Sequence, residues 1–205
     1  MSFEPRLSET PTLNVAHLQT PSWPHDQILH AWWVQPGRLL AGQYPGALDP
    51  VHSARKREVL LDAGVDSIVD LTEPGERGRG GKRLIPYEEL LRADAESRGL
   101  TLPRHSRHPI PDTNVIEDAG YDRILGHIRA ELDARRVVYV HCWGGKGRTG
   151  TVIGAWLIGT EGLDYDSTLR RLQELRRGTC EADHQVPDEP VQHDVLRRRA
   201  ARGRA

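Results

Sequence analysis

Residues 137–160 read VVYVHCWGGKGRTGTVIGAWLIGT, and this stretch decides the fold. Its first four residues, VVYV, are β-branched or aromatic, which is typical of a buried strand. Residues 149–160 are mostly apolar and run long enough for a buried helix. Three of the five residues between His141–Cys142 and Arg148 are glycines, so the chain can turn sharply there. The stretch therefore predicts a strand, a glycine-rich turn and a helix in immediate succession.

A turn of this kind is suited to binding an anion. Successive backbone N–H groups of a glycine-rich turn can point at one spot, and the positive end of the following helix dipole points there too. The size of that spot suits a phosphoryl group. The residues expected to bind it are Trp143, Gly144, Gly145, Lys146, Gly147 and Arg148.

The side chains around the turn add chemistry to this anion site. Cys142 lies at its bottom, where a thiol is expected to lose its proton readily and become a nucleophile. Arg148 offers a planar fork that can hold two phosphoryl oxygens at once, which a lysine cannot do. Thr149 can donate a hydrogen bond to the sulfur and so make it a better leaving group in a second step.

The run His141-Cys142-x5-Arg148-Thr149 resembles the protein tyrosine and dual-specificity phosphatase superfamily, whose motif is H-C-x5-R-[S/T] between a strand and a helix. The pattern of residues 37–192 is similar as well. The resemblance implies a cysteine-phosphatase fold and hydrolysis through a phosphocysteine intermediate, without a metal or other cofactor. It also implies that His141 orients the turn from behind by hydrogen bonding. A packed histidine at a strand end is the alternative for His141, and a buried structural cysteine or a rhodanese-like sulfurtransferase is the alternative for Cys142.

Cleavage of a phosphate ester also needs a general acid to protonate the leaving oxygen. The family resemblance places an aspartate on a loop some thirty residues before the cysteine, and Asp112 in HPIPDTN lies 142 − 112 = 30 residues before Cys142. Asp118 and Glu117 are closer rivals, but Asp118 is better placed as the N-cap of the next helix. Asp112 is the predicted acid, and an aspartate that only makes a turn is the alternative. The loop has no Trp-Pro-Asp, so closure of a lid driven by tryptophan is not expected.

The variable positions of the turn bear on the substrate. Lys146 makes the string GKGRTG resemble the loop of tensin-type lipid phosphatases, although Trp143 stands at that pattern's second basic position. The expected substrate is a phosphorylated protein, with phosphotyrosine first and phosphoserine or phosphothreonine also accepted. A phosphoinositide or inositol phosphate is the enzyme alternative, and a phosphate-binding module without activity is the other. Trp143 either forms an aromatic wall or shields the turn, and Lys146 can also be a solvated loop residue.

Three further features are weaker signals. Gln192, in PDEPVQ, resembles a family glutamine that positions the attacking water. Cys180 is read as inert, with a protective disulfide to Cys142 as the alternative. The arginines near the C-terminus, at 197–199, 202 and 204, are read as a solvated tail. No histidine pair has the spacing of metal ligands, so no metal site is predicted.

Length and composition allow one α/β domain. The chain has 205 residues, 28% of them charged, and a net charge of −1, which gives no overall attraction to nucleic acid. Residues 1–10 lack the apolar core of a signal peptide, no apolar run is long enough for membrane insertion, and a cytoplasmic location is expected. Residues 1–28 are polar and proline-rich and are expected to form an extended or poorly ordered arm, with a single phosphatase domain over residues 29–205. The sequence does not indicate an oligomeric state.

The remaining pattern alternates strands and helices. Such alternation favours a mainly parallel central sheet flanked by helices on both faces. Besides the strand at 137–140, strands are expected at residues 37–45, 66–71 and 100–108, with ordered structure from residue 28. Helices are expected at residues 51–63, 87–97, 118–135, 149–160, 165–177 and 189–199.

Overall fold

The computed structural model describes residues 23–203, in which five strands form one sheet in the order β1-β2-β5-β3-β4. β1 pairs antiparallel with β2, and every other pair of neighbours is parallel. β5, which leads into the glycine-rich turn, is the central strand. The predicted α/β fold with a mainly parallel sheet is therefore confirmed. The strands are β1 (Ala31–Gln35), β2 (Leu39–Gly42), β3 (Ser67–Asp70), β4 (Arg104–Arg107) and β5 (Val138–His141).

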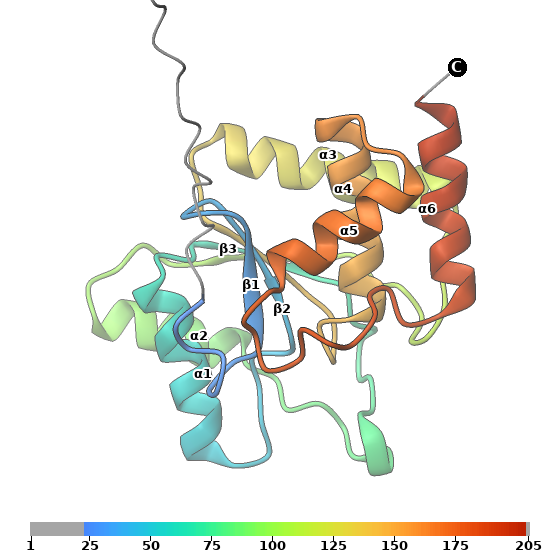
Figure 1. Cartoon of the computed structure of the whole chain (residues 1–205). Helices are drawn as coiled ribbons and strands as arrows, with labels where there is room; N and C mark the ends of the chain where they lie inside the picture. The colour runs from blue at the N-terminus through green and yellow to red at the C-terminus, as the bar shows by residue number, and fades with distance from the viewer. Residues whose placement is uncertain (1–22, 204–205) are drawn as a thin grey trace, which may run out of the picture.

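Helices cover both faces of the sheet, as Figure 1 shows. α1 and α2 lie on one side, and α3, α4, α5 and α6 lie on the other, where α4 contacts each of the other three helices. The helices are α1 (Pro50–Asp62), α2 (Glu88–Ser97), α3 (Asp118–Asp133), α4 (Gly147–Glu161), α5 (Tyr165–Leu175) and α6 (Pro190–Arg202), with a short 3-10 turn, η1, at Arg79–Gly81. All six predicted helices are present, with ends shifted by a few residues.

Strand residues alternate between two hydrophobic cores, because successive side chains of a strand point to opposite faces. In β5, Val138 and Val140 join the core beneath α3 to α6, whereas Tyr139 joins the core beneath α1 and α2. In β1, Trp32 and Trp33 divide in the same way. Both faces of the sheet are therefore buried along β1, β2, β3 and β5, which are rich in apolar residues, whereas the edge strand β4, with the sequence RHSR, is only partly buried.

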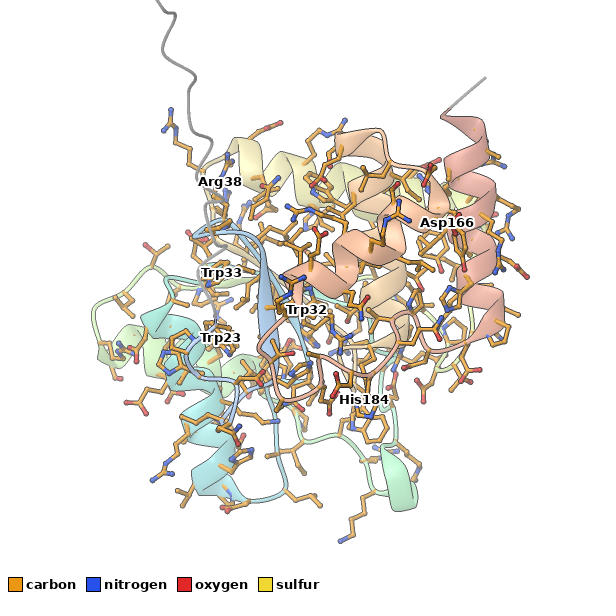
Figure 2. All side chains as sticks on the ribbon, viewed as in Figure 1. Trp23, Trp32, Trp33, Arg38, Asp166 and His184 are labelled. Atoms are coloured by element: carbon orange, nitrogen blue, oxygen red, sulfur yellow. The ribbon has the colours of Figure 1, made fainter. Side chains whose placement is uncertain are left out.

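The chain is already packed before β1. Residues 24–28 form turns, and the indole of Trp23 is buried, donating a hydrogen bond of 2.7 Å to the carbonyl of Leu29. Figure 2 shows Trp23 close to Trp33, and their rings meet edge to face. Packed structure thus includes the last six residues of the arm predicted for residues 1–28, and residues 1–22 of that arm lie outside the described residues.

Two predictions about helix ends were wrong. Glu117, not Asp118, is the N-cap of α3, and Asp118 is its first helical residue, where its carboxylate pairs with Arg202 at 2.7 Å. The arginine-rich end is helical up to Arg202 rather than a tail, and Arg199 reaches Asp122 on α3. Ion pairs between α6 and α3 therefore hold this end. Arg204 lies outside the described residues.

Two further boundaries differ from the sequence prediction. α4 begins at Gly147 rather than at residue 149, so Arg148 and Thr149 belong to its first turn. β4 is shorter than the predicted strand, and it lies at the edge of the sheet with a partner on one side only. Within residues 23–203, no helix is both long and apolar enough to span a membrane.

Candidate active site

Cys142 occupies the point where the central strand ends and the glycine-rich turn begins. It follows His141, the last residue of β5, and α4 starts five residues later at Gly147. Its side chain is only 3% exposed. Because α4 begins at this turn, the positive end of its dipole faces the thiol. The predicted strand, turn and helix are all present.

The turn needs glycine at position 145. Gly145 has a φ of +73°, and a Cβ placed there would lie 2.5 Å from the carbonyl carbon of Gly42 at the end of β2. The backbone of the turn is also bonded to this neighbouring chain, because the N–H of Tyr44 donates to the carbonyl of Trp143 at 2.9 Å. The turn is therefore braced against the segment that follows β2.

His141 is fully buried behind the turn and is bonded at both ring nitrogens. Nδ1 lies 3.1 Å from the carbonyl oxygen of Cys142, and Nε2 lies 2.6 Å from the hydroxyl of Tyr87. Because a carbonyl can only accept, Nδ1 carries the proton and Nε2 accepts from Tyr87. Burial lowers the pKa of His141, although the nearby charge of Asp70 opposes the effect. A neutral His141 thus holds the backbone of Cys142 from behind.

Thr149 lies behind the turn as well. Its hydroxyl is 3.5 Å from the carbonyl of Gly42, at the limit of a hydrogen bond. Its role as a donor to the Cys142 sulfur stays a prediction.

Arg148 is held in place by a residue that the sequence reasoning missed. Both guanidinium Nη atoms bond to the carboxylate of Glu76 at 2.7 Å, and Nη1 also donates to the carbonyl of Ile110 at 3.1 Å. Burial alone would lower the pKa of Arg148, but the hydrogen bonds to Glu76 and the surrounding negative groups raise it above the ordinary value. The side chains of Arg148 and Glu76 are 2% and 5% exposed, so the fork is fixed before any ligand arrives.

Asp112 reaches the same guanidinium from the opposite loop. Its Oδ1 lies 2.8 Å from Nη2 of Arg148, and its side chain is 46% exposed. The predicted acid and the predicted phosphate-binding arginine are therefore in contact, although they come from segments 36 residues apart in sequence.

These groups open onto one cavity of about 750 Å³. Of the predicted site residues, His141, Gly145 and Thr149 do not line it and lie behind the turn. The cavity is also lined by three carboxylates that the sequence analysis did not single out, those of Glu181, Asp188 and Glu189. Its lining residues are Gln43, Asp112, Thr113, Cys142, Trp143, Gly144, Lys146, Gly147, Arg148, Glu181, Asp188, Glu189 and Gln192.

Comparison with known families identifies this arrangement. The family model PTP-SAK, described as Swiss Army Knife protein, DSP-PTPase phosphatase domain, matches residues 30–195. The chain belongs to this family. Membership in the DSP-PTPase phosphatases confirms the predicted dual-specificity phosphatase superfamily, and it implies phosphatase activity.

Solved structures of phosphatases share the fold. Tk-PTP in its active form is 26% identical, with 88% of this chain and 99% of that chain covered and a TM-score of 0.62. The kinase associated phosphatase KAP is 18% identical over 86% of this chain and 97% of its own, with a TM-score of 0.60. PTPMT1 in complex with PI(5)P is 18% identical over 82% of this chain and 93% of its own, with a TM-score of 0.58.

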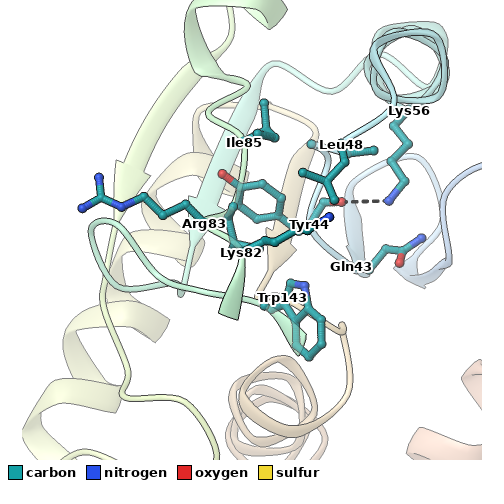
Figure 3. Close-up of a pocket in the computed structure, with 12 residues that line it drawn as sticks. Gln43, Tyr44, Leu48, Lys56, Lys82, Arg83, Ile85 and Trp143 are labelled. Carbon is teal, nitrogen blue, oxygen red and sulfur yellow. Dashed lines mark hydrogen bonds between the residues drawn. The ribbon is translucent and has the colours of Figure 1, made fainter. Parts of the chain in front are cut away.

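Trp143, an aromatic residue inside the phosphatase turn, lines two hollows. One is the cavity above Cys142, and the other, of about 200 Å³, lies between the turn and the segments around Tyr44 and Lys82. Figure 3 shows the second hollow, with Trp143 on one side and Lys56 reaching the carbonyl of Tyr44 at 3.2 Å. The indole also packs against Gly78, where an added Cβ would lie 2.9 Å from Nε1. Trp143 is thus a wall shared by both hollows.

The start of α6 closes the phosphatase cavity on a further side. Gln192 is buried, its Oε1 accepts from the N–H of Glu189 at 3.2 Å and its Nε2 donates to the carbonyl of Asn114 at 3.3 Å. Asp188 accepts a hydrogen bond from the N–H of Gly147, and burial raises its pKa. Gln192 thereby ties α6 to the acid loop through Asn114, and its role toward water stays a prediction.

Lys146 lines the remaining side together with Glu181, which follows Cys180 in the chain. Lys146 pairs with Glu181 at 3.1 Å, so its charge is already partly compensated. Cys142 and Cys180 are both free thiols, and Cys180 is exposed. The protective disulfide between them stays an untested alternative.

One signal in the sequence could have revealed Glu76. Ligand-binding groups of α/β proteins gather beyond the carboxyl ends of parallel strands. The glycine-rich loop after residues 66–71 leaves such a strand, and Glu76 is one of two glutamates in its first five residues. Tyr87 has no comparable signal, because its contact with His141 depends on where α2 packs.

Proposed function

We propose that this DSP-PTPase domain is a cysteine-dependent phosphatase that hydrolyses phosphate monoesters on proteins, phosphotyrosine first. The observation that carries the proposal is the convergence of Cys142, Arg148 and Asp112 on one cavity, with Arg148 fixed by Glu76. A nucleophile, an oxyanion clamp and an acid are the three parts that phosphoryl transfer through a covalent intermediate needs.

In the first step, the Cys142 thiolate attacks phosphorus in line with the ester oxygen. The P–S bond forms as the P–O ester bond breaks, and Asp112 gives its proton to the leaving oxygen. Arg148 and the N–H groups of the turn hold the other three oxygens, whose charge grows in the transition state. Phosphoryl oxygens compete with Asp112 for Arg148, so substrate binding releases the Asp112 carboxylate from its ion pair, and Asp112 takes up a proton from solvent before the ester bond breaks.

In the second step, water attacks the phosphocysteine. Asp112, now ionised, takes a proton from the water, the P–S bond breaks, and inorganic phosphate and thiolate are released. Thr149 supports the departure of the sulfur by donating a hydrogen bond once its hydroxyl turns from Gly42 toward Sγ. His141 holds the backbone of Cys142 throughout.

The charges of the cavity favour a phosphoprotein over a phosphoinositide. Lys146, which motivates the lipid alternative, is paired with Glu181. Asp188 and Glu189 add negative charge to the same lining. A ring that carries several phosphates would place its additional negative charges near these carboxylates. A peptide with one phosphate adds no such charge.

A substrate panel tests the proposal. The full-length protein is assayed in chelator-containing buffer on a phosphotyrosine peptide, a phosphoserine peptide and phosphoinositide vesicles, beside Cys142→Ser and Lys146→Ala. We expect the phosphotyrosine peptide to be turned over fastest and Cys142→Ser to lose about 10³-fold or more in kcat. Equal turnover by wild type and Cys142→Ser would refute the mechanism. If the wild type instead turned over phosphoinositides faster than the peptides, and Lys146→Ala abolished this preference, the assignment would change from a phosphoprotein to a lipid substrate.

A further inference from the structure

Three side chains with metal-binding atoms meet beside the catalytic cavity. Asp26 and His30 come from the turn before β1, and Cys180 comes from the segment after α5. One carboxylate oxygen, one imidazole nitrogen and the sulfur all lie within 4.8 Å of one another. Their sequence separation, 150 residues between His30 and Cys180, kept them from appearing as a motif.

The spacing of these atoms fits a tetrahedral metal. Asp26 Oδ1 lies 2.8 Å from His30 Nδ1, and Cys180 Sγ lies 3.8 Å from the same nitrogen. Ligands of tetrahedral zinc are about 2.0–2.3 Å from the metal, which places an oxygen–nitrogen pair about 3.4 Å apart and a nitrogen–sulfur pair about 3.6 Å apart. The nitrogen–sulfur pair is close to this spacing, the oxygen–nitrogen pair is shorter than it, and the oxygen–sulfur pair lies within 4.8 Å, so side-chain shifts of about 1 Å would bring all three atoms into a coordination sphere.

The second ring nitrogen of His30, Nε2, supplies an independent observation. The His30 side chain is 5% exposed, and its Nε2 faces Glu181 Oε2 at 3.9 Å. Among the described residues, Nε2 has no hydrogen-bond partner. If Nδ1 of a neutral His30 donates to Asp26, the lone pair of Nε2 points at a carboxylate, which is an unfavourable arrangement of two acceptors.

A metal at Nδ1 removes this conflict. The imidazole then gives its Nδ1 lone pair to the metal and carries its proton on Nε2, where it can be donated to Glu181. Histidines that bind metals commonly donate their other N–H to a carboxylate in this way. The second Asp26 oxygen accepts from the backbone N–H of Cys180, which orients the carboxylate.

We propose that Asp26 Oδ1, His30 Nδ1 and Cys180 Sγ bind one Zn²⁺ ion, with solvent as the fourth ligand. One thiolate, one imidazole and one carboxylate are a donor set that suits zinc better than the hard cations Mg²⁺ or Ca²⁺. The exposure of Cys180 gives the ion a path of entry and leaves room for water. The thiol loses its proton on binding.

A second group of possible ligands, Asp70, Glu88 and His105, does not carry the same inference. The guanidinium of Arg107 already contacts Asp70 at 2.9 Å and Glu88 at 2.6 Å. A cation therefore already occupies the position that a metal would take there. No arginine or lysine is bonded to Asp26 or Cys180 in the hydrogen bonds and ion pairs of residues 23–203, although the charge of Arg176 acts on both from a greater distance.

The zinc site would connect two segments at the edge of the phosphatase cavity. It would link the turn before β1 to the segment that carries Glu181, and Glu181 pairs with Lys146 of the catalytic turn. Zinc would thus fix the position of one wall of the cavity without touching the reacting groups. The inference does not depend on the proposed substrate, because it concerns binding rather than turnover.

Cobalt titration of the full-length Cys142→Ser variant tests the site. This variant keeps Cys180 as its single cysteine, so a thiolate-to-cobalt charge-transfer band can arise only there. We expect the band to saturate at one Co²⁺ per chain and to disappear when Zn²⁺ is added. Cys142→Ser/Cys180→Ser should lack the band and keep the metal-free thermal midpoint of its parent, because Cys180 is exposed.

Two further variants separate the site from general metal binding. Glu181→Gln should weaken Zn²⁺ affinity about 10-fold or more, the usual effect of changing a carboxylate that orients a ligating histidine. Asp183→Asn is the matched control, since Asp183 is an exposed carboxylate in the same segment and outside the donor set, and it should keep the affinity. Absence of the charge-transfer band in Cys142→Ser, or equal Zn²⁺ affinity with and without Cys180, would overturn the proposal.

Discussion

Arg148 Nη2 lies 2.8 Å from Asp112 Oδ1, so the proposed clamp and the proposed acid are in direct contact. Arg148 is also held by both oxygens of Glu76, which is nearly buried, whereas Asp112 is largely exposed. Buried Glu76 thus fixes the guanidinium of Arg148 on one side, and the exposed carboxylate of Asp112 contacts it on the other. A phosphoryl group that enters the turn can replace Asp112 without displacing Glu76.

Asp112→Asn is expected to slow esters with poor leaving groups much more than esters with good ones. The amide cannot give a proton to the leaving oxygen, and proton donation typically contributes about 10²–10⁴-fold. The measurement is kcat on a phosphotyrosine peptide and on a nitrophenyl phosphate. Thr113→Ala is the neighbouring control, because its hydroxyl donates only to the Asp112 carbonyl among the described contacts. Uniform loss on both substrates would instead assign Asp112 a structural role.

Glu76→Gln is expected to weaken the binding of phosphate-like inhibitors and to lower kcat/KM by about 10-fold or more. The amide keeps the shape of Glu76 but loses the charge-assisted, two-pronged bond to Arg148 that fixes the fork. Inhibition by vanadate and kcat/KM for the phosphotyrosine peptide would be measured together. Glu73→Gln, an exposed neighbour in the same loop, should leave both unchanged. Unchanged vanadate inhibition in Glu76→Gln would show that Arg148 does not need this support.

Gly145→Ala is expected to disable the turn. An alanine there would be strained at positive φ and would meet the backbone of Gly42 at 2.5 Å. Strain of this kind costs about 1–3 kcal/mol, and the displaced turn should lose about 10²-fold or more in kcat. Gly159→Ala in α4 is the control, because nothing lies within 4 Å of its Cβ and alanine favours helix by about 0.5–1 kcal/mol. Normal activity of Gly145→Ala would contradict the geometry of the turn.

The sequence predicted the fold, and it singled out Cys142, Arg148 and Asp112, which the structure brings to one cavity, because these features depend on local pattern. The strand, turn and helix around Cys142 follow from apolar runs separated by glycines. The distance between Asp112 and Cys142 follows from the helix and strand that must fit between them. Each of these features is set by residues close together in the chain, or by a spacing that the family resemblance supplied.

The partners of these groups could not be predicted in the same way. Glu76, Tyr87 and Glu181 act through contacts between elements that are distant in sequence, so their roles depend on packing. Asp118 was taken for an N-cap on residue type, but tertiary ion pairs with α6 use its carboxylate instead. The same ion pairs hold the arginine-rich end of α6 against α3, where a solvated tail was expected.

Lys56→Met is expected to stabilise the protein below about pH 8. Burial lowers the pKa of Lys56 from 10.5 to about 8, so between these values the unfolded state holds a proton that the folded state has released. Wild-type stability therefore rises with pH across this window, and below it the charged folded form carries a penalty of up to about 3 kcal/mol. The difference in unfolding free energy between Lys56→Met and wild type should be largest at pH 7 and shrink toward pH 10.5. A difference that does not change with pH would contradict the effect of burial.

The measurement that tests the mechanism most directly is trapping of the phosphoenzyme. Wild type and Cys142→Ser are mixed with a radiolabelled phosphotyrosine peptide, quenched in acid within a single turnover, and the labelled peptide is mapped after digestion. We predict label on Cys142 of the wild type and none on the same digest fragment of Cys142→Ser. Turnover by the wild type with no label at Cys142, or with label on another residue, would contradict nucleophilic catalysis by this cysteine.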